Sequence, residues 1–159
     1  MKRLWILLLL SLSHFAQPIH KPPAQPVPYS HKTHVGLGLS CKSCHHNPDP
    51  GEWMGIPETK ICMGCHASIK TDSPHIQKLA SFHNQQKQLP WVRIYSIPGY
   101  VFFSHRAHLE AGAKCENCHG QVAQRDALYR EGDISMGACM KCHEETKASN
   151  DCGFCHEPR

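Results

Sequence analysis

Ten cysteines in this 159-residue chain form five C-x-x-C pairs, and a histidine follows the second cysteine of every pair. Two thiols at this spacing can bond the two vinyl groups of one porphyrin, and the adjacent imidazole can ligate its iron. The sequence therefore predicts five covalently bound haem c groups, each with a proximal histidine. The motifs are motif 1 (Cys41, Cys44, His45), motif 2 (Cys62, Cys65, His66), motif 3 (Cys115, Cys118, His119), motif 4 (Cys139, Cys142, His143) and motif 5 (Cys152, Cys155, His156).

Two other uses of paired cysteines are possible. A disulfide scaffold could use ten cysteines, but it would not require a histidine after every second one. Zinc sites normally need two C-x-x-C pairs for each metal ion, so five pairs fit them poorly. Five histidine-terminated pairs in one chain favour haem over both alternatives.

Paired histidines precede motifs 1 and 3 at the same spacing. The first leader, residues 29–34 (YSHKTH), contains His31 and His34, and the second leader, residues 103–108 (FSHRAH), contains His105 and His108 74 residues later. Residues three apart on a helical turn project from one face, so these imidazoles cannot easily bind opposite sides of one iron. We expect them to be distal ligands that serve two adjacent haems; the alternative is that they are surface histidines.

Three further side chains are candidate ligands. His46 directly follows a proximal histidine, so it could ligate a neighbouring haem or be exposed to solvent. His83 is a candidate because it lies on the apolar face of an expected helix. Met136 could supply a thioether, which would raise the potential of its haem, or could be a packing residue.

Residues 74–83 carry the clearest helical pattern in the chain. Asp72 or Ser73 can cap the helix, Pro74 suits its first turn, and apolar residues recur along one face. Residues 91–95 (WVRIY) are β-like.

The remaining sequence shows little regular patterning, and about 30 residues per haem are too few to enclose each haem in its own pocket. We predict a mostly irregular chain with a few short α-helices, a multihaem cytochrome c fold built around packed haems, in which a two-haem module is duplicated. The expected divisions are a signal peptide at 1–16, a proline-rich tether at 17–28, a two-haem module at 29–71, a helix and linker at 72–101, a second two-haem module at 102–148 and the fifth haem site at 149–159.

The N-terminus is typical of an exported protein. Lys2 and Arg3 precede an apolar run at residues 4–12 that is too short to span a bilayer. Cleavage could follow Ser13 or Ala16, and a short uncleaved anchor is the alternative. We expect a periplasmic or other extracytoplasmic location, with no direct membrane span.

The first leader and motif 1 resemble those of the class III multihaem cytochromes, in which aromatic-x-H-x-x-H precedes C-x-x-C-H and the second histidine of C-x-x-C-H-H serves another haem. The order of YSHKTHVGLGLSCKSCHH, IPETKICMGCHASIKTDSP, PWVRIYSIPGYVFFSHRAH, ISMGACMKCH and NDCGFCH is similar to the pentahaem cytochrome subunit of alternative complex III and of related molybdopterin oxidoreductase complexes. This resemblance implies that His31 and His105 are the sixth ligands at motifs 1 and 3. It implies that His34 and His108 serve other haems.

Haem irons with two protein ligands have no open position for a substrate, so their use is outer-sphere electron transfer. We therefore expect no catalytic residue. The predicted function is a periplasmic respiratory electron wire between a quinol-oxidising or iron-sulfur partner and a cytochrome or oxidase acceptor, associated with a membrane-bound oxidoreductase complex. The alternative is a small multihaem reductase whose five-coordinate catalytic haem would be at motif 5, because that motif has no histidine-rich leader.

The formal net charge of +4 does not indicate a nucleic-acid partner. The propionates of five haems would add about ten negative charges and make the holoprotein acidic. Lysines and arginines are expected to pair with propionates and with an acidic docking face.

Overall fold

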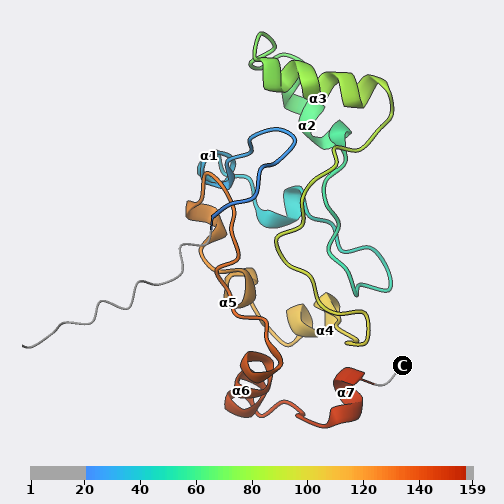
Figure 1. Cartoon of the computed structure of the whole chain (residues 1–159), viewed down its shortest axis with the longest axis vertical. Coiled ribbons are helices and arrows are strands. Elements are labelled where there is room, and N and C mark those ends of the chain that lie inside the picture. The colour runs from blue at the N-terminus through green and yellow to red at the C-terminus, as the bar shows by residue number, and fades with distance from the viewer. Residues whose placement is uncertain (1–20, 157–159) are drawn as a thin grey trace, which may run out of the picture.

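The computed structural model describes residues 21–156 (Figure 1). The expected signal peptide and the start of the tether lie outside the described residues. Within the described range the structure contains short helices and no strand, which confirms the predicted fold class. The elements are α1 (His31–Gly36), the 3₁₀-helix η1 (Cys41–Ser43), α2 (Thr59–His66), α3 (Pro74–Asn84), α4 (His105–Glu110), α5 (Cys115–His119), the 3₁₀-helix η2 (Val122–Gln124), α6 (Met136–Thr146) and α7 (Cys152–His156).

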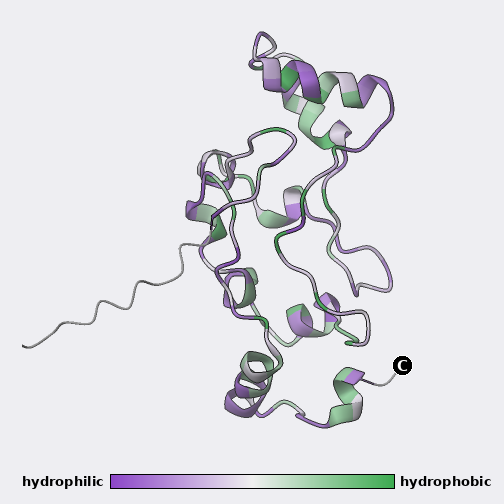
Figure 2. Cartoon of the chain, viewed as in Figure 1, coloured by the Kyte–Doolittle hydropathy of each residue, from purple (hydrophilic) through white to green (hydrophobic). Residues whose placement is uncertain are grey.

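The described chain is elongated. Figure 1 shows α2 and α3 at one end and α6 and α7 at the other, with coil segments running lengthwise between them. Figure 2 shows apolar and polar residues interspersed along this length. None of the helices in residues 21–156 has the length and apolar character needed to cross a membrane.

Both leaders form a short helix that begins with a serine cap. The hydroxyl of Ser30 accepts a hydrogen bond from the Thr33 amide at 3.0 Å, and the hydroxyl of Ser104 accepts one from the Ala107 amide at 3.3 Å. Such caps satisfy an amide that has no partner inside the helix. Each histidine pair therefore lies on a helical turn, as its spacing predicts.

Each leader helix bonds to the other copy of the module. The amide of Lys32 in α1 donates to the carbonyl of Arg125 at 3.0 Å, and the hydroxyl of Ser30 donates to Asp126 at 2.6 Å. In return, the amide of Arg106 in α4 donates to the carbonyl of Gly51 at 2.9 Å. The two copies are therefore interlocked by reciprocal contacts rather than arranged as separate domains.

Most haem motifs lie on helices. Motif 2 ends α2, motif 4 lies inside α6, and motifs 3 and 5 coincide with α5 and α7. The first cysteine of motif 1 begins η1. Cysteines three residues apart on such turns project from one side, as attachment to one porphyrin requires.

The only packed apolar cluster of the described residues lies between α2, α3 and the coil that precedes α1. Val27, Leu79 and Leu89 are 4–7% exposed, and partly buried apolar side chains including Ile76 and Phe82 surround them. Helix α3 begins at Pro74, next to Ser73, and confirms the predicted helix. Val27 shows that the end of the proline-rich segment packs against this helix rather than running free.

Residues 91–95 form no strand, so the interpretation of this segment as β-like was wrong. The side-chain amide of Gln25 takes the place of a neighbouring strand. It accepts a hydrogen bond from the Val92 amide and donates one to the Val92 carbonyl, both at 2.9 Å. Because the amide and the carbonyl of Val92 both bond to this one side chain, they do not pair with a neighbouring strand.

Gly132 gives a test of the packing between the coil after η2 and motif 3. A Cβ added at Gly132 would overlap the carbonyl oxygen of Cys118, and the neighbour is backbone that cannot rotate away. We predict that Gly132→Ala lowers the free energy of unfolding of the holoprotein by about 1–3 kcal/mol. Urea denaturation followed by circular dichroism provides the measurement.

Gly99→Ala is the matched control, because a Cβ at that position meets no atom within 4 Å. Its stability should stay within about 0.5 kcal/mol of the parent. Equal denaturation midpoints for Gly132→Ala and the parent would contradict the close approach of the two segments.

Candidate haem sites

Each proximal histidine of motifs 1 to 4 faces a histidine from one of the leaders. Because a metal–imidazole bond is about 2 Å long and the ligating nitrogen lies about 1.2 Å from the ring centre, two imidazoles on opposite sides of one metal ion have centres about 6.4 Å apart. All four observed separations are close to this value, so each pair fits one iron. The separations are 6.4 Å for His31 and His45, 6.2 Å for His34 and His66, 6.4 Å for His105 and His119, and 6.0 Å for His108 and His143.

Each leader helix contributes to two motifs. Helix α1 directs His31 to motif 1 and His34 to motif 2. Helix α4 directs His105 to motif 3 and His108 to motif 4. One helical turn therefore spans two neighbouring sites in each copy of the module.

The ring planes divide the pairs into two classes. At motifs 1 and 3 the facing rings are almost parallel, with interplanar angles of 3° and 4°. At motifs 2 and 4 they are rotated, by 62° and 34°. The same position in each leader thus gives the same class of pair.

Backbone carbonyls orient most of these histidines. A carbonyl oxygen can only accept, so a histidine Nδ1 bonded to one carries the proton and leaves Nε2 free to bind a metal. Such bonds are typical of histidines that ligate metals. The bonds are His34 to Ser30, His45 to Gly55 and His105 to Glu52 at 2.8 Å, His66 to Ile69 at 3.0 Å, His108 to Ser104 and His143 to Ser149 at 2.7 Å, and His156 to Tyr100 at 3.3 Å.

Two of the facing histidines have no such bond among the described residues. The Nδ1 atom of His31 is buried without a partner, and burial, with smaller effects from His45 and His34, lowers the pKa of His31 to about 4. Burial also lowers the pKa of His119, with smaller effects from His105 and His45. Both imidazoles are therefore held neutral, which is the form that binds a metal.

An aromatic ring at the start of each leader supports its two histidines. Tyr29 meets His31 edge-on, with ring centres 4.7 Å apart, and stacks on His34 at 4.4 Å. Phe103 meets His105 edge-on at 4.8 Å and stacks on His108 at 4.5 Å. The duplication is therefore preserved in side-chain geometry as well as in spacing.

The motifs follow one another in space in the order 2, 1, 3, 4, 5. Burial raises the pKa of one thiol at each junction, and the nearby thiol of the adjacent motif raises it further. Figure 1 shows the same order from α2 through η1, α5 and α6 to α7. The close thiol pairs are Cys62 with Cys44, Cys115 with Cys41, Cys118 with Cys142, and Cys139 with Cys155.

The remaining ligand candidates do not face a proximal histidine in the described part of the chain. His46 is exposed. Nδ1 of His83 lies 3.2 Å from the Thr59 hydroxyl, at the end of the molecule opposite α7 (Figure 1). Met136 is 65% exposed at the start of α6. The ring that lies against His156 belongs to Tyr100, at 6.0 Å.

Comparison with known families gives a direct match. A model of the class III cytochrome c family matches residues 12–94. The chain belongs to the class III cytochrome c family. A second model, of cytochrome c7 and related cytochromes c, matches residues 101–157 of this class III cytochrome, so each match contains one copy of the duplicated module. The cytochrome is therefore a multihaem electron-transfer protein that binds haem c covalently.

Two relatives of this class III cytochrome have informative names. The multihaem cytochrome c subunit of the menaquinone reductase of Nitratidesulfovibrio vulgaris is 29% identical over an alignment of 171 positions. The alignment covers 90% of this chain and 81% of the relative. Cytochrome c3 of Desulfovibrio desulfuricans is 27% identical over 96 residues, which cover 59% of this chain and 78% of the relative. Multihaem c-type cytochromes of this kind are typically extracytoplasmic.

The cysteines of the cytochrome fit this cofactor. None of the ten, all of which lie in the described residues, forms a disulfide, so each can bond a porphyrin vinyl group. In the described range, no group of three or more histidine, cysteine or acidic side chains is arranged to hold a metal ion. The candidate ligands are instead facing pairs of imidazoles, an arrangement that suits a metal that a porphyrin already surrounds.

Some site residues of the cytochrome escaped the sequence reading. The aromatic residue two positions before the first histidine was part of the class III resemblance, but the support that Tyr29 and Phe103 give to both histidines of each leader was not predicted. The carbonyls of Gly55 and Glu52 have no sequence signal, because every residue has a carbonyl. Only the fold shows which ones reach a histidine.

The ring angles predict two classes of low-spin ferric signal in the electron paramagnetic resonance spectrum of the holoprotein. Parallel imidazoles donate to the same iron d orbital and raise its energy above that of the second d orbital of the pair. Rotated imidazoles raise the energies of both orbitals, which gives a larger principal g value. We expect His31→Leu to remove one signal of the parallel class and convert that haem to high spin. His34→Leu should instead remove one signal of the rotated class.

Spectra of the two variants, recorded together with their haem content, provide the check. His105→Leu and His108→Leu are the matched pair in the second copy and should give the same two results. Unchanged low-spin signals, or loss of the same signal in His31→Leu and His34→Leu, would contradict the pairing.

Proposed function

We propose that this class III cytochrome is a periplasmic pentahaem protein that conducts electrons along the order of motifs 2, 1, 3, 4 and 5. The observation that carries the proposal is the continuous series of neighbouring motifs, in which each leader helix spans two sites and thiols of adjacent motifs lie close together. Closely spaced redox centres of this kind suit outer-sphere transfer. The haem irons supply the redox change, and the chain supplies their spacing and ligands.

The protein residues have three roles in this proposal. The cysteines would attach the haems, and the facing histidines would hold the irons at motifs 1 to 4. Carbonyl acceptors such as those of Gly55 and Ile69 make the imidazoles more basic, which stabilises the oxidised iron. An iron held by two histidines would have no open position for a substrate, so these four sites favour conduction over catalysis.

The proposed partners follow from the relative. The Nitratidesulfovibrio protein is named as a subunit of a menaquinone reductase. We propose that this chain likewise belongs to a membrane-associated complex that exchanges electrons with a quinone pool and with a second redox protein. The proposed export signal at residues 1–16 would bring the chain to the compartment where covalent haem is attached.

Intact-mass measurement of the mature holoprotein tests the haem count. We expect the mass of the chain plus five haems, because each motif has two cysteines outside any disulfide and an adjacent histidine. A variant with both Cys152 and Cys155 changed to serine should retain four haems. The same double change at motif 4 is the matched control and should also give four.

A mature chain with no haem, or with five haems after loss of motif 5, would contradict this assignment. Redox titration followed by visible spectroscopy adds the functional measurement. All five haems should be reduced and reoxidised reversibly, whereas a haem that stays oxidised throughout would argue against a continuous wire.

A further inference from the structure

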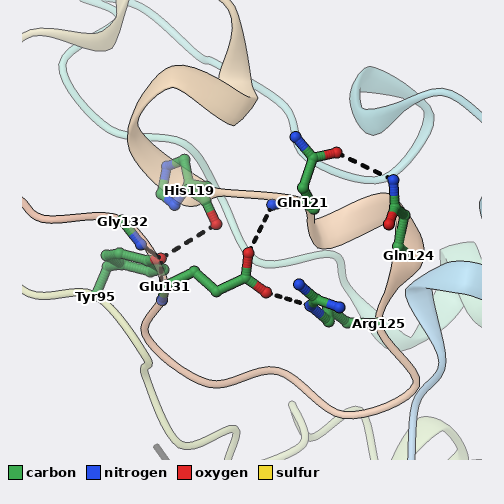
Figure 3. Close-up of polar contacts among 7 residues, drawn as sticks. All are labelled: Tyr95, His119, Gln121, Gln124, Arg125, Glu131 and Gly132. Carbon is green, nitrogen blue, oxygen red and sulfur yellow. Dashed lines mark hydrogen bonds and ion pairs between the residues drawn. The ribbon is translucent and has the colours of Figure 1, made fainter. Parts of the chain in front are cut away.

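Tyr95 lies outside both two-haem modules, in the coil between α3 and α4, yet it contacts the proximal histidine of motif 3. Its ring meets the His119 imidazole edge-on, with centres 4.6 Å apart and an interplanar angle of 82°. Its hydroxyl donates to the His119 carbonyl at 3.1 Å. Figure 3 shows Tyr95 held between His119 and the segment that contains Glu131 and Gly132.

The position of the Tyr95 ring is fixed by its hydroxyl. Besides donating to His119, the oxygen accepts hydrogen bonds from the amides of Glu131 at 3.0 Å and Gly132 at 2.9 Å. A phenol has one proton to donate and two lone pairs to accept, so these three bonds use its full capacity. The ring therefore has little freedom to turn away from the imidazole.

The segment that contains Glu131 also bonds the residues that follow His119 in the chain. The Glu131 carboxylate accepts a hydrogen bond from the Gln121 amide at 2.9 Å and forms an ion pair with Arg125 (Figure 3). Arg125 in turn receives the Lys32 amide bond from the leader helix α1. This network, which we call the Tyr95 clamp, comprises Tyr95, Gln121, Arg125, Glu131 and Gly132.

His119 differs from the other proximal histidines in how its ring is held. The rings of His45, His66 and His143 are held by carbonyls of residues that follow them in the chain. After His119 the backbone turns at Gly120, which has a φ of +72°, a conformation that favours glycine. No carbonyl of the described residues bonds Nδ1 of His119, yet its ring is within 4° of parallel to that of His105.

We propose that Tyr95 is a positioning residue that holds the His119 imidazole parallel to His105, in place of the carbonyl that orients the other proximal rings. The proposal rests on the haem ligation given under the proposed function. An edge-on aromatic ring limits rotation about the Cβ–ring bond of His119 by steric contact, without polarising Nδ1. Tyr95, which lies outside both modules, would thereby determine how far the iron d-orbital energies at motif 3 are separated.

Two variants separate the ring from the hydroxyl. Tyr95→Leu removes the ring, so the His119 imidazole can rotate, and the parallel-class signal of motif 3 should shift toward the rotated class. Tyr95→Phe retains the edge contact but leaves two amides without their acceptor. We expect it to keep the parallel signal and to unfold at lower temperature.

Electron paramagnetic resonance of the oxidised holoprotein provides the readout, with haem content measured by mass for each variant. The His31→Leu variant assigns the signals, because the parallel signal that it retains belongs to motif 3. Tyr100→Leu is the matched control, since Tyr100 also lies against a proximal histidine but belongs to motif 5. Its motif 3 signal should match that of the parent.

The inference is overturned if Tyr95→Leu leaves the motif 3 signal in place, or if Tyr95→Phe shifts it as far as Tyr95→Leu does. Loss of the motif 3 haem alone in Tyr95→Leu, with the parallel signal kept in Tyr95→Phe, supports it. A parent protein without five haems would instead refute the proposed function. The parent measurement therefore distinguishes the two failures.

Discussion

Facing pairs of imidazole rings, at separations that fit one metal ion between them, are the interaction on which this structure depends. The leader helices are only six residues long, too short to be stable alone, and a serine cap and an aromatic ring assist each of them. Their value lies in placing two histidines on one turn. Each turn then determines how far apart two neighbouring sites can be, and the coil between helices has only to reach from one site to the next.

The scarcity of buried side chains follows from this arrangement. In the described residues, the packed apolar cluster is confined to the end formed by α2 and α3, where Leu79 meets Val27 and Leu89. Along the rest of the length, backbone carbonyls bond histidine rings, and reciprocal contacts join the leaders to the opposite copy. Irregular backbone is well suited to this role, because its carbonyls are not used up in a helix or sheet ladder.

Local patterns predicted the local structure well. The spacing of the leader histidines indicated helical turns, and the apolar face after Pro74 indicated α3, because both signals involve residues within one or two turns of each other. Contacts between distant residues were not predictable in this way. The β-like segment at 91–95 forms no strand, and the backbone of Val92 bonds instead to the side chain of Gln25, 67 positions away. The spatial order of the motifs and the position of Tyr95 against His119 likewise depend on how the two copies interlock.

The proximity of Cys41 and Cys115 shows how the two copies meet. Each of these cysteines begins the first motif of its copy, so the copies are joined head to head, and the second motif of each copy points outward. In a head-to-head pair, further motifs can be added at the two outer ends, and motif 5 lies at one of these ends, beside motif 4. The reach of such a molecule can therefore be lengthened by adding one short C-x-x-C-H helix at a tip, while the central junction and both leaders stay unchanged.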